Sequence, residues 1–251
     1  MPAPRAVFSY TDEEVRALEL ALSAERFQFY LQLAGSSRVR AIRLYERNTA
    51  LSKSLYGVAQ ATEVALRNAI HRILSDSVSP MWFYRIDLHE NQLDKVNEAK
   101  FDLEQNLKSV TPGALVAELR LGFWTSLIST RYENLLWRPH LHKAFPNAWD
   151  ERPDGVGGIS RTKKKRPDIF GQLERIRILR NRIAHHEPII KLDLPRSYFE
   201  ALEALHWVCS VSSLWVKSTS SFVERFKDNA ASITAPPRTP AAGAPIPGSP
   251  K

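Results

Sequence analysis

Cysteine is nearly absent from this chain. Cys209 is the one cysteine among 251 residues, so the chain cannot form an internal disulfide. A protein without a disulfide framework fits a reducing compartment. Cys209 follows Trp207 and Val208, and we expect its thiol to fill the core rather than to act as a nucleophile.

Long apolar segments are also missing. No stretch reaches the roughly 18 uncharged apolar residues that a membrane-spanning helix needs. Residues 1–10 lack the apolar region of a secretory signal. We therefore expect a cytoplasmic protein that does not associate with a membrane.

The motifs of several enzyme classes are missing as well. The chain has no Gly-rich phosphate-binding loop and no serine motif of the nucleophile-elbow type. His140 and His142 could chelate a metal, but no cysteine cluster or helical His–Glu pair accompanies them. His185, His186 and Glu187 are adjacent, which is the wrong spacing for one metal on one helix face. We expect neither a metal nor a cofactor.

What the composition does supply is apolar content and positive charge. Hydrophobic residues make up 43% of the chain, which is enough for a sizeable core. Lys and Arg number 35 and Asp and Glu 27, so the formal net charge is +8, and the pI is about 9.7. This balance favours an anionic partner, of which nucleic acid is the commonest. A basic protein without such a partner would have the same composition.

Apolar residues recur every three or four positions along most of the chain, which is the pattern of amphipathic helices. Thr11 and Glu14 match a capping box, and Thr111 before Pro112 matches a helix start. We expect helices over residues 11–34, 38–75, 91–110, 112–138, 167–186 and 196–226. No repeated period-two alternation indicates strands. The predicted fold class is therefore all-α, a bundle with long amphipathic helices.

Two segments are expected to be irregular. Residues 229–251 are rich in Pro and Ala, and we predict a disordered tail there after a single domain over residues 1–228. Residues 149–167 are rich in Gly and Pro and are predicted to form a loop. This loop contains a cationic stretch, which we call the basic run: Arg161, Lys163, Lys164, Lys165 and Arg166. Residues 163–166 are the candidates for RNA binding, although a solvated loop explains the same charges equally well.

The helix expected over residues 167–186 has one feature that packing does not explain. On a helical projection its apolar residues fall within an arc of about 120°. These residues are Ile169, Leu173, Ile176, Leu179 and Ile183. Arg180 falls inside the same arc, and arginine is seldom buried without a partner. Arg180 therefore pairs with a carboxylate such as Glu63, or points into a cleft or across a subunit interface.

Polar residues follow Arg180 at spacings that one helix cannot bring together. Five residues along an ideal helix rotate His185 by about 140° from Arg180, and six rotate His186 by about 120° the other way. Neither histidine therefore stacks over the arginine. A second copy of the helix, packed antiparallel across a two-fold axis, could bring an arginine and a histidine from each chain into one cleft.

These residues carry a family resemblance. The order Arg180, Asn181, three residues, His185 resembles the ribonuclease motif of the HEPN superfamily. Residues 179–188 are similar to its Abi-like branch, which is linked to bacterial abortive infection against phage. Other segments, from residue 23 onward, are also similar to that branch: residues 63–70, Tyr45, Asn48, Leu51 with Ser52, and residues 122–124.

The resemblance implies a HEPN-like bundle that forms a homodimer and cleaves RNA without a metal. By position, Arg180 would hold the phosphate, His185 would act as acid or base, and Asn181 would support them. His186 and Glu63 are further supporting candidates, and spacing does not exclude His186 as the working imidazole. RNA supplies its own nucleophile, the 2′-hydroxyl, and an imidazole can take or return a proton near neutral pH. The expected product carries a 2′,3′-cyclic phosphate.

A structural interpretation accounts for the same residues separately. Exposed carbonyls favour a histidine at a helix C-terminus. Glu63 and Arg67 are four residues apart, which is the spacing of a simple helix pair. The leading hypothesis is nevertheless an endoribonuclease, as a toxin or anti-phage effector, with RNA, a second copy and a possible protein or RNA antitoxin as partners. The alternative is a non-catalytic RNA- or protein-binding module of the same fold.

Overall fold

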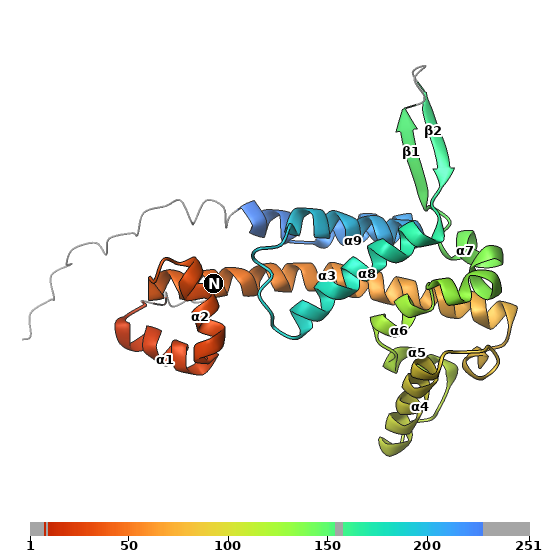
Figure 1. Ribbon diagram of the computed structural model, residues 1–251, viewed down its shortest axis with the longest axis horizontal. Helices are drawn as coiled ribbons and strands as arrows, with labels where there is room; N and C mark the ends of the chain where they lie inside the picture. Colours follow the sequence, from red (N-terminus) through yellow and green to blue (C-terminus); the bar gives the residue numbers. More distant parts are fainter. Residues whose placement is uncertain (1–7, 9, 154–157, 228–251) are drawn as a thin grey trace, which may run out of the picture.

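A computed structural model describes residue 8, residues 10–153 and residues 158–227. In these residues the fold is an all-α bundle built along α3, a continuous helix over Arg38–Ser77 (Figure 1). The stripe predicted for this helix is buried, since its apolar residues recur every three or four positions between Leu51 and Leu74. The predicted all-α fold is therefore confirmed. The predicted tail over residues 229–251 lies outside the described residues.

The first two helices form a small core of their own at one end of α3 (Figure 1). The capping box predicted for Thr11 is present in α1 (Asp12–Leu22), where the Thr11 N–H donates to the Glu14 carboxylate at 2.8 Å. The single helix predicted over residues 11–34 is wrong. Ser23 takes a left-handed conformation with φ 69° and separates α1 from α2 (Ala24–Leu33). The break lets both helices turn apolar side chains toward the start of α3. The buried residues of this small core are Val15 of α1, Phe27 and Tyr30 of α2, Ala34 after it, and Ala41 and Ile42 of α3.

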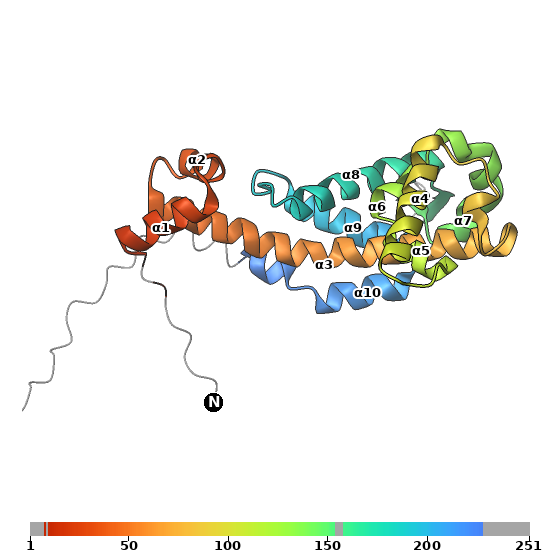
Figure 2. The ribbon, with the colours of Figure 1, turned by 90° about the horizontal axis from the view of Figure 1, so that it is seen from below.

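A larger core lies between α3 and the C-terminal helices α8 (Arg166–Ala184), α9 (Leu194–Val208) and α10 (Ser210–Thr219). In Figure 2, α8 and α10 lie on opposite sides of α3. The single helix predicted over residues 196–226 is wrong, because Cys209 is extended and divides α9 from α10. The Cys209 thiol is half-buried, and its sulfur accepts a hydrogen bond from the Ser212 N–H at 3.4 Å. The side chain and then the backbone N–H of Ser212 lower the pKa of the thiol, which caps α10 rather than simply filling the core.

Short helices connect α3 with α8 and complete the larger core (Figure 1). They are η1 (Trp82–Tyr84), α4 (Glu90–Gln105), α5 (Pro112–Glu118), α6 (Leu121–Ser126), η2 (Thr130–Tyr132), the π-helical turn η3 (Glu133–Trp137) and α7 (Arg138–Ala144). Thr111 caps α5 as predicted, accepting from the Ala114 N–H at 3.2 Å. The long helix predicted over residues 112–138 is wrong, because it breaks at Leu119 and again after Ser126. Pro139 lies in the first turn of α7, where a missing N–H costs no helical hydrogen bond.

The predictions of a loop over residues 149–167 and of no strands are wrong. Strands β1 (Trp149–Pro153) and β2 (Ile159–Lys163) pair antiparallel and project from the bundle (Figure 1). All five residues of β2 are exposed. Because neither face of β2 packs on a core, no period-two apolar pattern was needed to form it.

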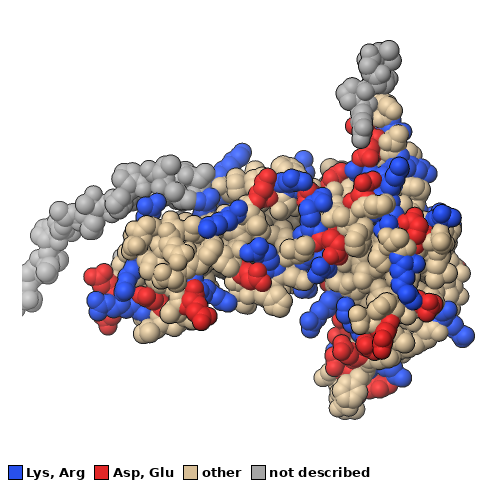
Figure 3. Space-filling view, viewed as in Figure 1, with Lys and Arg blue, Asp and Glu red and all other residues tan. Residues whose placement is uncertain are grey.

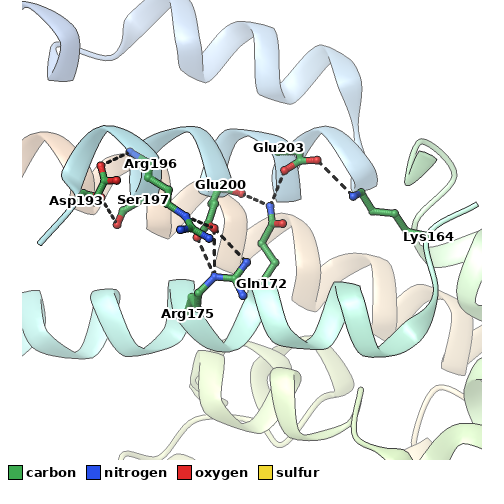
Figure 4. A network of polar contacts seen from close by, with 8 residues as sticks. All are labelled: Lys164, Gln172, Arg175, Asp193, Arg196, Ser197, Glu200 and Glu203. Atoms are coloured by element: carbon green, nitrogen blue, oxygen red, sulfur yellow. Dashed lines mark hydrogen bonds and ion pairs between the residues drawn. The ribbon is translucent and has the colours of Figure 1, made fainter. Parts of the chain in front are cut away.

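Polar contacts fasten α8 to α9 beside the apolar core (Figure 4). Glu200 of α9 accepts hydrogen bonds from Arg175 of α8 and from Arg196, and Gln172 donates to the Glu200 carbonyl at 2.8 Å. Burial alone would raise the pKa of Glu200, but the hydrogen bonds from the two guanidinium groups outweigh it and hold the pKa below its usual value. Among the described residues, no helix is both long and apolar enough to cross a membrane.

Candidate functional site

The Arg-Asn-x3-His segment lies in the last turns of α8 and in the turn that follows. α8 ends at Ala184, and His185 is the C-cap residue. The His186 N–H donates to the Ile183 carbonyl at 3.0 Å and the Glu187 N–H to the Arg182 carbonyl at 2.8 Å, which is the Schellman pattern. His186 therefore occupies the left-handed position, φ 57°, where glycine is usual. Both histidines are exposed, and the turn gives them fixed and different directions.

The turn after α8 is held from α3 by one buried amide. The Asn48 Oδ1 accepts hydrogen bonds from the Ile189 N–H at 2.8 Å and from the Ile190 N–H at 3.2 Å. Asn48 is only 5% exposed. The sequence signal for this role is a polar residue between Tyr45 and Leu51 on an otherwise apolar helix face. Its function as a clamp was not predicted, because residues 48 and 189 are distant in the sequence.

Arg180 points from α8 toward α3 and binds Glu63. The Arg180 Nε lies 3.2 Å from the Glu63 Oε2, and the two side chains are 19% and 12% exposed. This is the carboxylate partner that the sequence suggested. Within the described part of the chain, neither Nη1 nor Nη2 of Arg180 has a hydrogen-bond partner. Glu63 thus orients the guanidinium through one edge and leaves its two terminal nitrogens for another acceptor.

The helix pair proposed between Glu63 and Arg67 does not form. Among the described residues, Glu63 has one ion-pair partner, which is Arg180. The Arg67 Nε is buried and has no hydrogen-bond partner in the described part of the chain. Arg177, three residues before Arg180, is bound by Glu174 at 2.8 Å, which raises the pKa of its guanidinium. Arg180 therefore brings guanidinium nitrogens that have no acceptor among the described residues to the α3–α8 interface.

A groove of about 560 Å³ opens between α3 and the end of α8. Six residues of α3 line it: Tyr45, Asn48, Thr49, Ser52, Lys53 and Tyr56. From the other side come Ile183, Ala184 and His186. His185 is not among the lining residues. The structure therefore places His186, the supporting candidate, against a cavity, and His185 on the outer surface.

Helical phase connects this groove with the Arg180–Glu63 pair. Ala184, which lines the groove, is four residues after Arg180 and so lies on the same side of α8. On α3, Tyr56 and Glu63 are seven residues apart, about two turns, and also share a face. The groove and the ion pair are therefore successive parts of one α3–α8 surface. Asn181, the residue after Arg180 in α8, is half-buried.

The basic run does not act as one patch. Arg166 is buried and binds Glu133, the Ile128 carbonyl at 2.9 Å and the Thr130 hydroxyl at 3.1 Å. Lys164 is 14% exposed and lies 2.6 Å from the Asp150 carboxylate. It also lies 3.7 Å from the Glu203 carboxylate, the contact drawn in Figure 4.

The other cations of the run stay at the surface. Lys163 and Lys165 are exposed, and the Lys163 ammonium lies 5.5 Å from the centre of the Trp149 ring. Arg161 pairs with Glu151 across the hairpin. On the face seen in Figure 3, basic and acidic groups are interspersed over the bundle. Of the four RNA-binding candidates, only Lys163 and Lys165 remain available to a phosphate.

His140 and His142 lie on α7, and burial lowers the pKa of both imidazoles. In the described ranges, no three His, Cys, Asp or Glu side chains gather as metal ligands would. No protein-family model, curated protein or solved structure matches the chain.

Proposed function

We propose that this chain is a metal-independent endoribonuclease of the HEPN type, with its site at the C-terminal end of α8. The observation that carries the proposal is Arg180. Its guanidinium is oriented by Glu63, at 3.2 Å, and offers two nitrogens that have no partner in the described part of the chain, one helical turn from Ala184 in the groove wall. Such a preoriented, partly buried guanidinium suits a phosphate that gains charge during reaction.

The chemistry uses the substrate's own nucleophile. A base takes the proton from the 2′-hydroxyl, whose oxygen attacks phosphorus, and the bond from phosphorus to the 5′-oxygen breaks. An acid returns a proton to that leaving oxygen, so the products are a 2′,3′-cyclic phosphate and a 5′-hydroxyl. His185 and His186 are the imidazoles that would exchange these protons. Asn181 supports the phosphate or an imidazole.

A homodimer is part of the proposal. Gly171, Ile178 and His185 recur every seven residues on the outward side of α8, and the Ile178 side chain is 51% exposed. A small residue and an exposed isoleucine in line suit close approach of a second helix. A second copy is needed to complete the site, because the monomer holds Arg180 against α3 and His185 away from it on the outer surface.

The biological setting proposed is that of a toxin or anti-phage abortive-infection effector. A cell that holds an active endoribonuclease needs a means of restraining it. An antitoxin, either protein or RNA, is therefore the proposed regulatory partner, alongside the RNA substrate.

RNA cleavage by the purified protein in excess EDTA tests the proposal. The wild-type protein should release fragments with 2′,3′-cyclic phosphate ends, and a double variant, His185→Ala with His186→Ala, should release none. Arg131→Ala, in an exposed surface pair with Asp87, is the matched control and should cleave normally. Cleavage that persists in the double variant would contradict the proposal.

One observation favours the alternative, a module that binds RNA or a protein without turnover. α10 exposes Val211, Leu214 and Trp215 along one face, at 72%, 67% and 64%. Exposed apolar side chains gathered in this way are typical of surfaces that contact another protein. The binding module predicts RNA affinity that falls steeply with salt and no new RNA ends.

A further inference from the structure

The groove between α3 and the end of α8 has a function of its own that the ribonuclease motif does not specify. We propose that it binds one unpaired RNA base beside the scissile phosphate, with the Tyr56 ring as the stacking surface. The assignment of the neighbouring phosphate to Arg180 rests on the proposed function. The recognition of a base rests on the groove itself.

The lining chemistry matches a nucleotide. The wall offers two phenol rings, from Tyr45 and Tyr56, two aliphatic hydroxyls, from Thr49 and Ser52, and the Asn48 amide. A volume of about 560 Å³ is within the range of small-molecule sites. Flat aromatic surfaces beside hydrogen-bonding groups are what protein sites for unpaired bases provide.

The two tyrosines differ in how free their rings are. The Tyr45 ring packs edge-on against Tyr30, with centroids 5.4 Å apart, so it forms part of the wall. Tyr56 is 39% exposed and has no aromatic partner among the described residues. The Tyr56 ring is therefore the one that has a free face on which a base can stack. Stacking on such a ring tolerates every base because each base has a π-face.

The charged side chains that line the groove favour an anionic strand over a cation. Among the described residues no carboxylate lines the groove, whereas Lys53 and His186 do. The Lys53 side chain is exposed and has no ion-pair or hydrogen-bond partner in the described part of the chain. An unpaired lysine at the rim suits the phosphate that joins the bound nucleotide to its neighbour.

The two helices determine how close the bound base lies to the phosphate at Arg180. Tyr56 lies two turns before Glu63 on one face of α3, and Glu63 fixes Arg180. A base stacked on Tyr56 therefore belongs to a nucleotide close to the phosphate at Arg180. Paired RNA cannot offer an unstacked base, so single-stranded RNA is the preferred ligand.

Fluorescence anisotropy with a labelled, fully 2′-O-methylated RNA octamer tests this base site. The probe lacks the nucleophile, so binding is measured whether or not the protein cleaves RNA. Tyr56→Ala should weaken binding by about 5- to 150-fold, the effect of losing one stacked base. Tyr56→Phe keeps the ring and should bind within about twofold of wild type. Tyr84→Ala is the matched control, since Tyr84 is 44% exposed on η1, and should not change affinity.

A second probe, the same octamer backbone with every base removed, separates stacking from damage to the fold. Tyr56→Ala should not change its affinity. An equal loss for both probes, or no loss for either, would overturn the base site. Cleavage of RNA by wild type with no effect of Tyr56→Ala on binding would remove this inference alone. Base-dependent binding through Tyr56 without any cleavage would remove the ribonuclease and leave the base site standing.

Discussion

The end of α8 and the basic run both carry cationic side chains from which RNA contacts were expected, and the fold uses them differently. In the run, Arg166 and Lys164 bind carboxylates and carbonyls of the protein itself. At α8, Glu63 takes one edge of Arg180 and leaves two nitrogens unbound within the described chain. The density of positive charge along the sequence therefore does not indicate how much of that charge a ligand can reach.

The largest expected effect comes from the left-handed residue at the end of α8. His186→Gly should lower RNA cleavage by about 10²- to 10⁴-fold, the usual contribution of a general acid or base. The same change should not destabilise the fold, because glycine adopts φ 57° without the cost that a side chain carries there. Cleavage rate and thermal unfolding are measured on the same preparation. Unchanged cleavage would place the working imidazole at His185 alone.

The helix α4 provides a control for that experiment. Leu107 has φ 54° after the end of α4, in the same Schellman pattern, and its side chain is 96% exposed. Leu107→Gly should therefore also preserve or raise stability and should leave cleavage unchanged. A loss of cleavage in this variant would show that the comparison between the two helix ends is wrong.

Arg166→Ala should have the largest effect on stability within the basic run. Removing the buried guanidinium costs about 2–4 kcal/mol, because the Ile128 carbonyl and the Thr130 hydroxyl lose their donor and the half-buried Glu133 carboxylate loses its partner. Urea unfolding measures this loss. Under conditions in which the variant remains folded, its affinity for RNA should match that of wild type. A specific loss of RNA affinity without destabilisation would show that Arg166 contacts RNA.

Asn48→Ala should destabilise the protein by about 2–4 kcal/mol, because two N–H groups lose their acceptor. For a chain of this size that corresponds to a fall of roughly 5–15 °C in the melting temperature. Thr49→Ala is the matched neighbour and should cost less, since its hydroxyl donates to the Tyr45 carbonyl of its own helix. An Asn48→Ala variant as stable as wild type would show that the turn is held by its other contacts.

The smallest effect is expected from the exposed cations of the run. Lys163→Ala with Lys165→Ala should reduce the salt dependence of RNA binding by a slope of about 2 at most, one for each phosphate contact. Titrations at several salt concentrations measure this slope. No change would assign both lysines to the solvated surface of the hairpin.

Local patterns predicted the parts of the fold whose causes are local. The buried face of α8 and the caps at Thr11 and Thr111 follow from periodicity and side-chain hydrogen bonds over a few residues. The breaks at Ser23 and Cys209 were missed, because those residues are compatible with a helix and tertiary packing decides their conformation. The hairpin was missed because its exposed strands have no apolar alternation.

The candidate site divides in the same way. The order of Arg180, Asn181 and His185 is visible in the sequence, and Glu63 was foreseen as one partner for the arginine. The groove was not, because it depends on which face of α3 meets the end of α8. Tyr56 and Lys53 are unremarkable on their own helix and become candidates only when His186 lies opposite them.

The most direct test of the account is the cleavage rate of a single RNA at saturating concentration, compared between Arg180→Ala and the double variant Lys163→Ala with Lys165→Ala. The account predicts that Arg180→Ala loses about 10²- to 10³-fold in rate, as expected for a group that stabilises developing charge, while the lysine variant cleaves at the wild-type rate. An Arg180→Ala variant that cleaves normally, with the loss confined to the lysine variant, would contradict it and place the working site at the hairpin.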